Sequence, residues 1–356
     1  MSELSARFYL NWPGFTLDVD LQLPDRGVTA LFGHSGSGKT SLLRCIAGLE
    51  RPAHGRLVFR GQIWQDETQW LPTHRRPLGY VFQEASLFPH LSVLGNLQYG
   101  QRRSATAGRI GLEQAIELLG IGPLLTRRPD SLSGGERQRV GIARALAVGP
   151  KILLMDEPLA ALDLKRKQEI LPYLERLRDE LAIPILYVSH APDEVARLAD
   201  HLVAMEQGRV IAAGPLGPTL ARLDLPIRLG EDAGVVLEAQ IGAIEAEWQL
   251  ARVDFAGGSL WSRNHDIPVG RRVRVRVLAR DVSLSLGDPG QSSIQNCLNG
   301  VVEAIGADDH PGLQLVRVRV GASCVIARIT RRSAAQLQLG IGTPVHVQIK
   351  SVALME

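Results

Sequence analysis

The sequence predicts an α/β domain followed by small all-β barrels, and three observations support this fold class. A glycine-rich loop joins the short apolar run 28–32 to a helical pattern over residues 41–48. The apolar runs 152–155 and 185–188 are unbroken, as parallel strands buried on both faces are. Beyond about residue 230, short strand patterns follow one another without a long helix. This order of elements predicts a parallel sheet covered by helices and then a strand-rich tail.

The composition argues against several classes of protein. The chain has 356 residues, enough for two or three domains, with 45% hydrophobic residues and a net charge of +3. No apolar run approaches the roughly 18 to 20 residues that cross a bilayer, and no signal peptide is visible. The basic excess is too small to predict nucleic-acid binding, and the three cysteines lack metal-ligand spacing. We therefore expect neither an integral membrane chain nor a partner nucleic acid.

The glycine-rich loop has the spacing of a phosphate-binding loop. Its residues are Gly33, His34, Ser35, Gly36, Ser37, Gly38, Lys39 and Thr40. Backbone N–H groups of such a loop, and the N-terminus of the helix behind it, bind phosphate oxygens. Lys39 can reach the β- and γ-phosphates, and the Thr40 hydroxyl can ligate Mg²⁺. The segment predicts binding of a nucleoside triphosphate.

The residues before the loop predict a half-buried strand with an aromatic side chain near the nucleotide. Leu17, Val19 and Leu21 alternate with polar residues, which is the period of a strand with one buried face. Phe15 or Trp12 lies just upstream and is a candidate to stack on an adenine ring. Packing of these rings in the core is the alternative, and the sequence leaves it open.

A polar residue also follows the predicted strand at residues 78–83. This strand ends on the amide of Gln83, which can reach Mg²⁺ or the attacking water of a bound nucleotide. The apolar residues 87–89 come directly afterwards, and we expect them to form a docking surface for a partner protein. Residues 85–131 then predict a mainly helical region, with the polar run 101–111 as an exposed loop.

A second glycine motif, Leu-Ser-Gly-Gly-Glu, begins at residue 132. Ser133 is a good N-cap residue, and Gly134 and Gly135 expose backbone N–H groups to an anion at the start of a helix. One nucleotide hardly needs two such anion sites on one chain unless they face different nucleotides. The motif therefore predicts a head-to-tail homodimer in which each subunit closes its partner's site.

Two carboxylates end the apolar run 152–155. Ligands of open α/β sheets bind at the C-terminal ends of the strands. We expect Asp156 to hold Mg²⁺ through water, and Glu157 to act as general base or to orient the attacking water. The alternative, two exposed acids that only cap a strand, leaves the other two motifs unexplained.

These motifs, in this order, resemble the ATP-binding-cassette family, whose signature is Leu-Ser-Gly-Gly followed by Glu or Gln. The resemblance covers about residues 1–230 and implies a RecA-like core with a helical subdomain at about residues 85–131. It implies ATP as the nucleotide, Mg²⁺ as the metal ion, Asp163 in the family's D-loop, and His190 as the switch that contacts the γ-phosphate. The implied catalytic residues are Lys39, Gln83, Glu157 and His190, and the implied Mg²⁺-binding residues are Thr40, Gln83 and Asp156.

The tail predicts two barrels of the OB type, at residues 231–289 and 290–356. In the first, Arg272, Arg274 and Arg276 alternate with valines, so that one strand face is charged and the other is apolar. We interpret the charged face as solvent-exposed rather than as a surface for nucleic acid.

The second barrel resembles the Mop/TOBE unit of molybdate-binding proteins at residues 292–296, 327–330 and 349–352. Small hydrogen-bond donors and a lysine suit a tetrahedral oxyanion. The candidate oxyanion site comprises Ser293, Asn296, Thr330, Lys350 and Ser351. Gln295 stands where that family often has arginine. The alternative is a barrel that only dimerises and regulates, as in sugar and polyamine importers.

Together the resemblances imply the ATPase subunit of a molybdate importer, and residues 71–76 and 87–90 also resemble such ATPases. This subunit is expected as a homodimer on the cytoplasmic face of the inner membrane, as a peripheral protein. Its expected partners are two transmembrane permease subunits and, through them, a periplasmic or external molybdate-binding protein. Import of sulfate, polyamine or sugar is the alternative within this class. A soluble, non-transport cassette ATPase is the alternative outside it.

Overall fold

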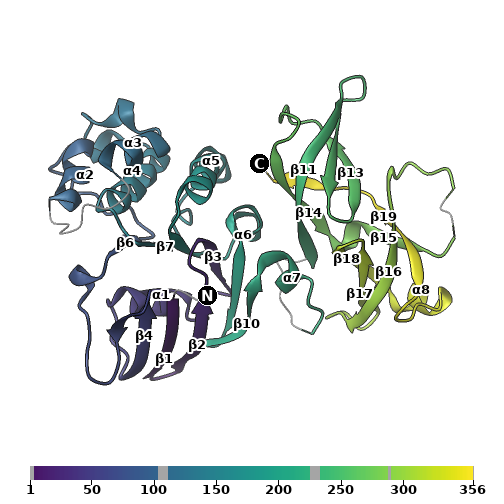
Figure 1. Ribbon diagram of the computed structural model, residues 1–356, viewed down its shortest axis with the longest axis horizontal. Helices are drawn as coiled ribbons and strands as arrows, with labels where there is room; N and C mark the ends of the chain where they lie inside the picture. The colour runs from purple at the N-terminus through teal and green to yellow at the C-terminus, as the bar shows by residue number, and fades with distance from the viewer. Residues whose placement is uncertain (1–3, 103–110, 225–232, 288–289, 356) are drawn as a thin grey trace. The chain divides into compact units, whose positions relative to one another are not determined.

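The computed structural model describes residues 4–102, 111–224, 233–287 and 290–355, which form two compact units (Figure 1). The N-terminal unit comprises Met1–His190 and Leu198–Gly214, and the C-terminal unit comprises Ala191–Arg197 and Pro215–Glu356. The expected domain boundary between residues 230 and 231 lies outside the described residues, as do residues 103–110 of the expected loop.

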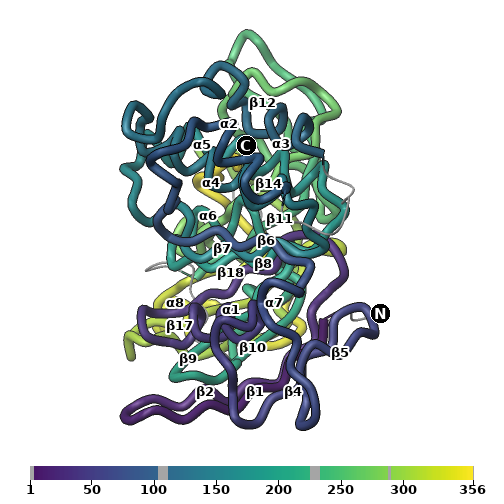
Figure 2. Tube along the Cα trace, turned by 90° about the vertical axis from the view of Figure 1, so that its left-hand side faces the viewer, coloured from purple at the N-terminus to yellow at the C-terminus, as the bar shows by residue number. Residues whose placement is uncertain are grey.

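One sheet organises the described part of the N-terminal unit. Its strands are β1 (Leu4–Trp12), β2 (Phe15–Leu23), β3 (Gly27–Phe32), β4 (His54–Phe59), β5 (Gln62–Gln65), β6 (Leu78–Val81), β7 (Ile152–Asp156), β8 (Pro184–Val188), β9 (His201–Glu206) and β10 (Arg209–Pro215). They lie in the order β5-β4-β1-β2-β10-β9-β3-β8-β7-β6. The strands from β9 to β6 are parallel, whereas β4, β1 and β2 pair antiparallel and lie side by side in Figure 2.

The parallel half of the sheet is buried on both faces because helices cover it. These helices include α1 (Lys39–Ala47), α4 (Gly134–Leu146) and α5 (Leu164–Glu180). Ile152 and Leu154 of β7 belong to the same hydrophobic cluster as α1, while Leu153 and Met155 belong to the cluster of α4 and α5. Alternate residues of one strand thus serve two cores, which explains its unbroken apolar sequence. The predicted α/β core is confirmed.

The predicted helical region, at about residues 85–131, contains α2 (Val93–Gln101), α3 (Leu112–Leu118) and the short 3-10 turns η2 (Gly122–Leu124) and η3 (Pro129–Ser131). α4 begins three residues beyond that range and packs with α2 and α3. Another 3-10 turn, η1 (Thr73–Arg75), precedes β6. The three helices gather beside β6 and β7 in Figure 1. Leu97, Leu118 and Ile142, one from each helix, are fully buried in the same cluster. No helix among the described residues is long and apolar enough to span a membrane.

Two antiparallel sheets form the described part of the C-terminal unit. The first contains β11 (Gly234–Glu245), β12 (Leu250–Phe255), β13 (Gly258–Arg263), β14 (Arg272–Leu278) and β20 (Ala353–Met355). The second contains β15 (Val282–Ser285), β16 (Asn296–Ala307), β17 (Leu313–Val320), β18 (Ser323–Thr330) and β19 (Pro344–Ile349). The helical pieces are α6 (Pro192–Leu198), α7 (Leu216–Leu220), η4 (Ala279–Asp281) and α8 (Arg331–Gln336). The predicted all-β, OB-like tail is confirmed.

The two sheets exchange strands across the boundary expected near residue 290. β15 precedes that boundary and pairs with β19, while β20 at the end of the chain returns to pair with β14. One hydrophobic cluster contains Val275 of the first sheet and Val318 and Val347 of the second. Residue 289 is not described, so the boundary itself stays a prediction.

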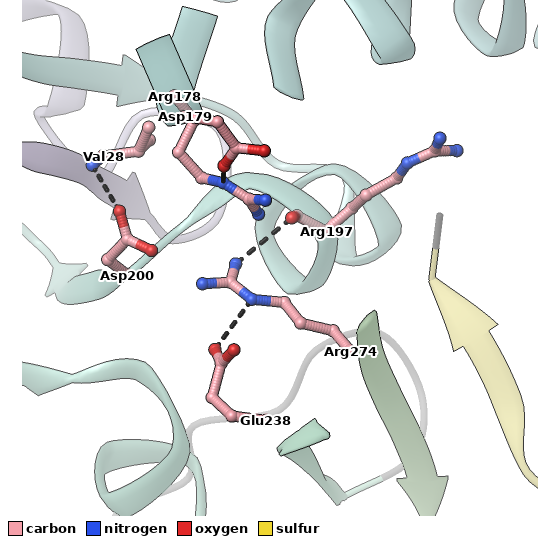
Figure 3. A network of polar contacts seen from close by, with 7 residues as sticks. All are labelled: Val28, Arg178, Asp179, Arg197, Asp200, Glu238 and Arg274. Carbon is pink, nitrogen blue, oxygen red and sulfur yellow. Dashed lines mark hydrogen bonds and ion pairs between the residues drawn. The ribbon is translucent and has the colours of Figure 1, made fainter. Parts of the chain in front are cut away.

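The expectation of a solvent-exposed arginine face on β14 is wrong for Arg274 and Arg276, whereas Arg272 is exposed. Arg274 is only 7% exposed. Its Nε donates to Glu238 at 2.8 Å and its Nη1 to the backbone carbonyl of Arg197 at 3.1 Å (Figure 3). Arg276 forms an ion pair with Asp193. The segment 191–197 thus supplies acceptors to both arginines, and a strand pattern alone does not reveal such a tertiary cover.

Candidate active site

The phosphate loop is shaped by glycines that no other residue replaces without strain. Gly33 has φ +157°, and a Cβ there would lie 2.2 Å from the carbonyl oxygen of Met205. Gly38 has φ +98°, and a Cβ there would lie 2.9 Å from the Phe15 ring. α1 begins at the next residue, so its N-terminus faces the loop as the spacing predicts.

Lys39 lies inside this loop and is 4% exposed. Its Nζ donates to the carbonyls of Gly33 and His34, both at 2.8 Å, and to Ser37 Oγ at 3.4 Å. Burial lowers the pKa of Lys39, and the carboxylates of Glu157 and Asp156 oppose that shift. The hydrogen bonds of the ammonium group thus go to oxygen atoms of the loop, and it is positioned to exchange them for phosphate oxygens.

Asp156 sits at the tip of β7 with both carboxylate oxygens engaged. Oδ1 accepts a hydrogen bond from Thr40 Oγ1 at 2.8 Å, and Oδ2 accepts one from the Tyr80 hydroxyl at 3.1 Å. Burial, and then the nearby charge of Asp156, raises the pKa of Tyr80, which keeps this hydroxyl protonated. Thr40 and Asp156 are thus brought together across 116 residues of sequence, as the motifs predict.

A hydroxyl beside a carboxylate is a set of hard oxygen donors, and this set fits Mg²⁺. The third residue expected at the metal, Gln83, is exposed and lies two positions beyond β6. Its placement next to the nucleotide stays a prediction.

Glu157 and His190 meet at the ends of neighbouring parallel strands, β7 and β8. Glu157 Oε2 lies 3.3 Å from His190 Nδ1, and the His190 side chain is 58% exposed. Glu157 has φ +44°, a left-handed conformation that is strained for a residue with a side chain. Its N–H donates to the carbonyl of Val188 at 3.2 Å, which anchors this turn on β8. The two residues expected to handle the attacking water therefore form one contact pair.

The Leu-Ser-Gly-Gly-Glu motif forms the N-terminus of α4 as predicted. Ser133 caps the helix by accepting from the N–H of Glu136 at 3.2 Å, and Glu136 accepts in return from the N–H of Ser133 at 2.8 Å. Asp163 caps α5 in the same manner, through the N–H of Arg166. Ser133 and Asp163 are both exposed. Contact of Ser133, Gly134, Gly135 and Asp163 with a nucleotide stays a prediction.

Phe15 is the better placed of the two candidate aromatic residues. Its ring lies against the position of Gly38 in the phosphate loop, while Trp12 stacks behind it with ring centroids 6.0 Å apart. Both side chains are half-buried and pack against the core of the sheet. Phe15 therefore packs against the core and also borders the phosphate loop, so core packing does not exclude contact with an adenine ring.

The segment after Gln83 is held by two side chains that the sequence did not single out. Asn96 is fully buried, accepts from the N–H of Phe88, and donates to the carbonyls of Phe88 and Ser92. Arg144 of α4 donates to the carbonyls of Ala85 and Ser86, at 3.2 and 2.9 Å. The Arg144 guanidinium also lies over the Phe88 ring, at 5.3 Å. These contacts tie the segment to two helices.

Tyr80 is the residue at the active site that sequence reasoning missed. The sequence identifies it only as part of an apolar strand. The signal lies in the strand register, because Tyr80 pairs with Leu154 and so shares a sheet face with Asp156, two residues further on. That register is not visible before the sheet is known.

Three of the five tail residues expected to bind an oxyanion form hydrogen bonds within the protein. The Asn296 amide accepts from and donates to the backbone of Trp261, at 2.6 and 3.0 Å. Thr330 caps α8, and Ser351 donates to the carboxylate of Asp281 at 2.9 Å. Ser293 and Lys350 are exposed. Their convergence on one anion stays a prediction.

Comparisons with known proteins agree with both halves of the chain. The profile of the ABC transporter family matches residues 16–160, and that of the TOBE domain matches residues 292–355. The chain is 71% identical over 356 residues to the molybdenum import ATP-binding protein ModC of Methylococcus capsulatus, covering 100% of both chains. It is 66% identical over 353 residues to the protein of the same name from Thiobacillus denitrificans, covering 99% of this chain and 98% of that one.

Two solved structures share the fold over 60% of the chain. One is cbiO1 from Clostridium perfringens, part of the ABC transporter complex cbiONQ, with 29% identity, a TM-score of 0.53 and 88% of that chain covered. The other is a dimeric ABC transporter cassette, MJ0796, with 26% identity, a TM-score of 0.50 and 98% of that chain covered.

Proposed function

Since this chain belongs to the ABC transporter family, we propose that it is the ATPase subunit that couples ATP hydrolysis to molybdate uptake across the cytoplasmic membrane. The observation that carries this proposal is the identity of 71% to a molybdenum import ATP-binding protein over the full length, tail included. The tail matters because it is the part in which the sequence resembles molybdate-binding proteins. The TOBE match at residues 292–355 covers the same region.

In the proposed reaction, the side chains of this chain bind the triphosphate and direct a water molecule at it. Lys39 transfers its hydrogen bonds from the carbonyls of Gly33 and His34 to phosphate oxygens. The Glu157 carboxylate accepts a proton from the attacking water, or orients that water, at a point where His190 contacts the same carboxylate. His190 adds a contact to the γ-phosphate. Gln83 contacts the water from the next strand.

Mg²⁺ is proposed at Thr40 and Asp156, with Gln83 as a further ligand. When bound, this ion neutralises charge on the β- and γ-phosphate oxygens. The Thr40 hydroxyl and the Asp156 carboxylate, 2.8 Å apart, supply the oxygen donors. Phe15 is the residue proposed to stack on the adenine.

The proposed assembly is a homodimer that binds two transmembrane permease subunits on the cytoplasmic face of the inner membrane. An external molybdate-binding protein would act through the permease. The dimeric state of the MJ0796 cassette supports a dimer. In this dimer, Ser133, Gly134, Gly135 and Asp163 of one subunit contact the nucleotide held by Lys39 of the other. The exposure of Ser133 and Asp163, which cap α4 and α5, and the partial exposure of Gly134 support this proposal.

Transport of radiolabelled molybdate tests the proposal. The chain is reconstituted in proteoliposomes with its permease and binding protein, and ATP-dependent uptake is measured with molybdate, sulfate and a polyamine. We expect uptake of molybdate that the Lys39→Ala variant loses. Uptake of sulfate or polyamine without molybdate would favour another importer. ATP hydrolysis that never couples to any uptake would favour a soluble, non-transport ATPase.

A further inference from the structure

The hydroxyl of Tyr80 contacts the active site. The hydroxyl lies 3.1 Å from Asp156 Oδ2, while Thr40 Oγ1 lies 2.8 Å from the other oxygen of the same carboxylate. Asp156 is thereby held from two sides, by a residue of the phosphate loop and by a residue of β6. Thr40 belongs to the phosphate-loop motif, whereas Tyr80 belongs to none of the nucleotide-binding motifs.

The Tyr80 ring is fixed independently of this hydrogen bond. It is half-buried in the core of the sheet and packs on Phe82 with ring centroids 4.4 Å apart. β6 pairs with β7 in a register that places Tyr80 beside Leu154, on the face that also carries Asp156. The hydroxyl is therefore a fixed donor, and the carboxylate is the group that it orients.

The two carboxylate oxygens of Asp156 are expected to differ in the hydrogen bonds that they keep when a nucleotide binds. With a metal ion bound, the Thr40 hydroxyl would serve as its ligand, and Oδ1 of Asp156 would lose this donor and be available to the ion, directly or through water. Oδ2 keeps the Tyr80 donor and cannot rotate into the place of Oδ1 without breaking that bond. Partners of this kind orient metal-binding groups in many proteins, and their removal typically lowers metal affinity.

We propose that Tyr80 is a positioning residue for Mg²⁺ binding, which acts by holding the Asp156 carboxylate in the orientation that the metal requires. The inference rests on the proposed function, since it concerns the same nucleotide site. It makes a separate claim, however, because nucleotide binding without metal should not depend on the Tyr80 hydroxyl.

The test is Tyr80→Phe, which removes one oxygen atom and keeps the ring that packs on Phe82. Binding of a non-hydrolysable ATP analogue is measured in Mg²⁺ and in EDTA. We expect the affinity for the analogue in EDTA to be unchanged. The factor by which Mg²⁺ increases this affinity should fall about tenfold. Bound Mn²⁺, followed by its electron paramagnetic resonance, should show a similar loss, and high Mg²⁺ should restore ATP hydrolysis.

Tyr9→Phe is the matched control, because Tyr9 lies on β1 and is 45% exposed. It should leave both affinities unchanged. A Tyr80→Phe protein with the wild-type Mg²⁺ dependence overturns the inference, and so does an equal loss of affinity in Mg²⁺ and in EDTA. If no variant and no wild-type protein binds the analogue at all, the proposed ATPase function fails instead.

Discussion

Glu157 combines a backbone conformation that disfavours side chains with the contact that the reaction needs. A residue at φ +44° directs its side chain differently from its neighbours on the strand, and here the carboxylate reaches His190 Nδ1. Strain of this kind costs about 1–3 kcal/mol and persists only where the surroundings enforce it. The backbone bond to Val188 is one of the contacts that enforce it.

Glu157→Gln tests the role of the carboxylate, because the amide keeps the shape of the side chain and removes the base. We expect ATP binding to remain while hydrolysis falls by about 10²- to 10⁴-fold, the range attributed to general bases. The closed dimer should then accumulate in ATP, as size-exclusion chromatography can show. Hydrolysis near the wild-type rate would remove Glu157 from the mechanism.

Residues of this site were predictable where a motif carries its own chemistry. Thr40 and Asp156 follow from their positions in the loop and at a strand tip, and the structure brings them within 2.8 Å. Glu157 and His190 were each expected at a strand tip, but their contact follows from the pairing of β7 with β8, which the structure shows. Tyr80 could not be predicted, because its role depends on which residue of β7 it faces.

At the scale of elements, the turn after Gln83 connects the active site to an exposed aromatic surface. The rings of Phe88 and Tyr99 pack with centroids 4.3 Å apart, and Tyr99 is 37% exposed. We propose that these two rings receive a helix of the membrane partner. Asn96 and Arg144 hold this turn on α2 and α4. Movement of the partner can thus reach both Gln83 and the helix that begins at Gly134.

Phe88→Asp places a charge on this surface. We expect the purified subunit to hydrolyse ATP at nearly the wild-type rate and to fail to co-purify with the permease. Tyr9→Asp places the same charge on an exposed aromatic residue of β1, and it should change neither ATP hydrolysis nor co-purification with the permease. An unfolded Phe88→Asp protein would show that Phe88 is a core residue, and Phe88→Ala would then separate packing from docking.

Asn96→Ala tests the turn itself. The side chain is fully buried, and its removal takes the acceptor from the N–H of Phe88 and one donor each from the carbonyls of Phe88 and Ser92, which keep their bonds to the N–H groups of Leu91 and Asn96. We expect the free energy of unfolding to fall by about 1–3 kcal/mol. Denaturant titration measures this loss. A variant as stable as the wild type would show that the turn does not depend on Asn96.

Elements were predicted well where burial follows from local pattern, as for β7 and α4. The arginine strand β14 was misjudged because its cover comes from residues 191–197, about 80 positions upstream. A charged strand face looks the same in sequence whether water or another segment lies on it.

At the scale of the whole molecule, the proposed dimer makes each site depend on two chains. We expect a mixture of Lys39→Ala and Ser133→Arg subunits to recover part of the ATPase activity that each variant lacks alone. A mixed dimer contains one intact composite site and one doubly damaged site. Activity that stays at the level of the parents, with mixed dimers demonstrated by mass spectrometry, would argue against shared sites or require both sites to act together.

The tail is proposed to bind the transported oxyanion and so to slow import when molybdate is abundant. Calorimetry should use the full chain, because β15 and β20 exchange between sheets and a fragment from residue 290 would lack β15. We expect heat with molybdate, little with sulfate, and a weaker response in Lys350→Ala than in Lys151→Ala. Absence of heat at millimolar molybdate would end the regulatory proposal and leave import untouched.

The contacts of Arg274 and Arg276 also determine where this protein can be recombined with its relatives. Arg274 is 7% exposed and bonds to the carbonyl of Arg197, and Arg276 pairs with Asp193. A chimaera that takes only the tail from another importer therefore separates residues 191–197 from the arginines to which they bond. The exchangeable module is discontinuous, and a successful graft must carry residues 191–197 together with the tail.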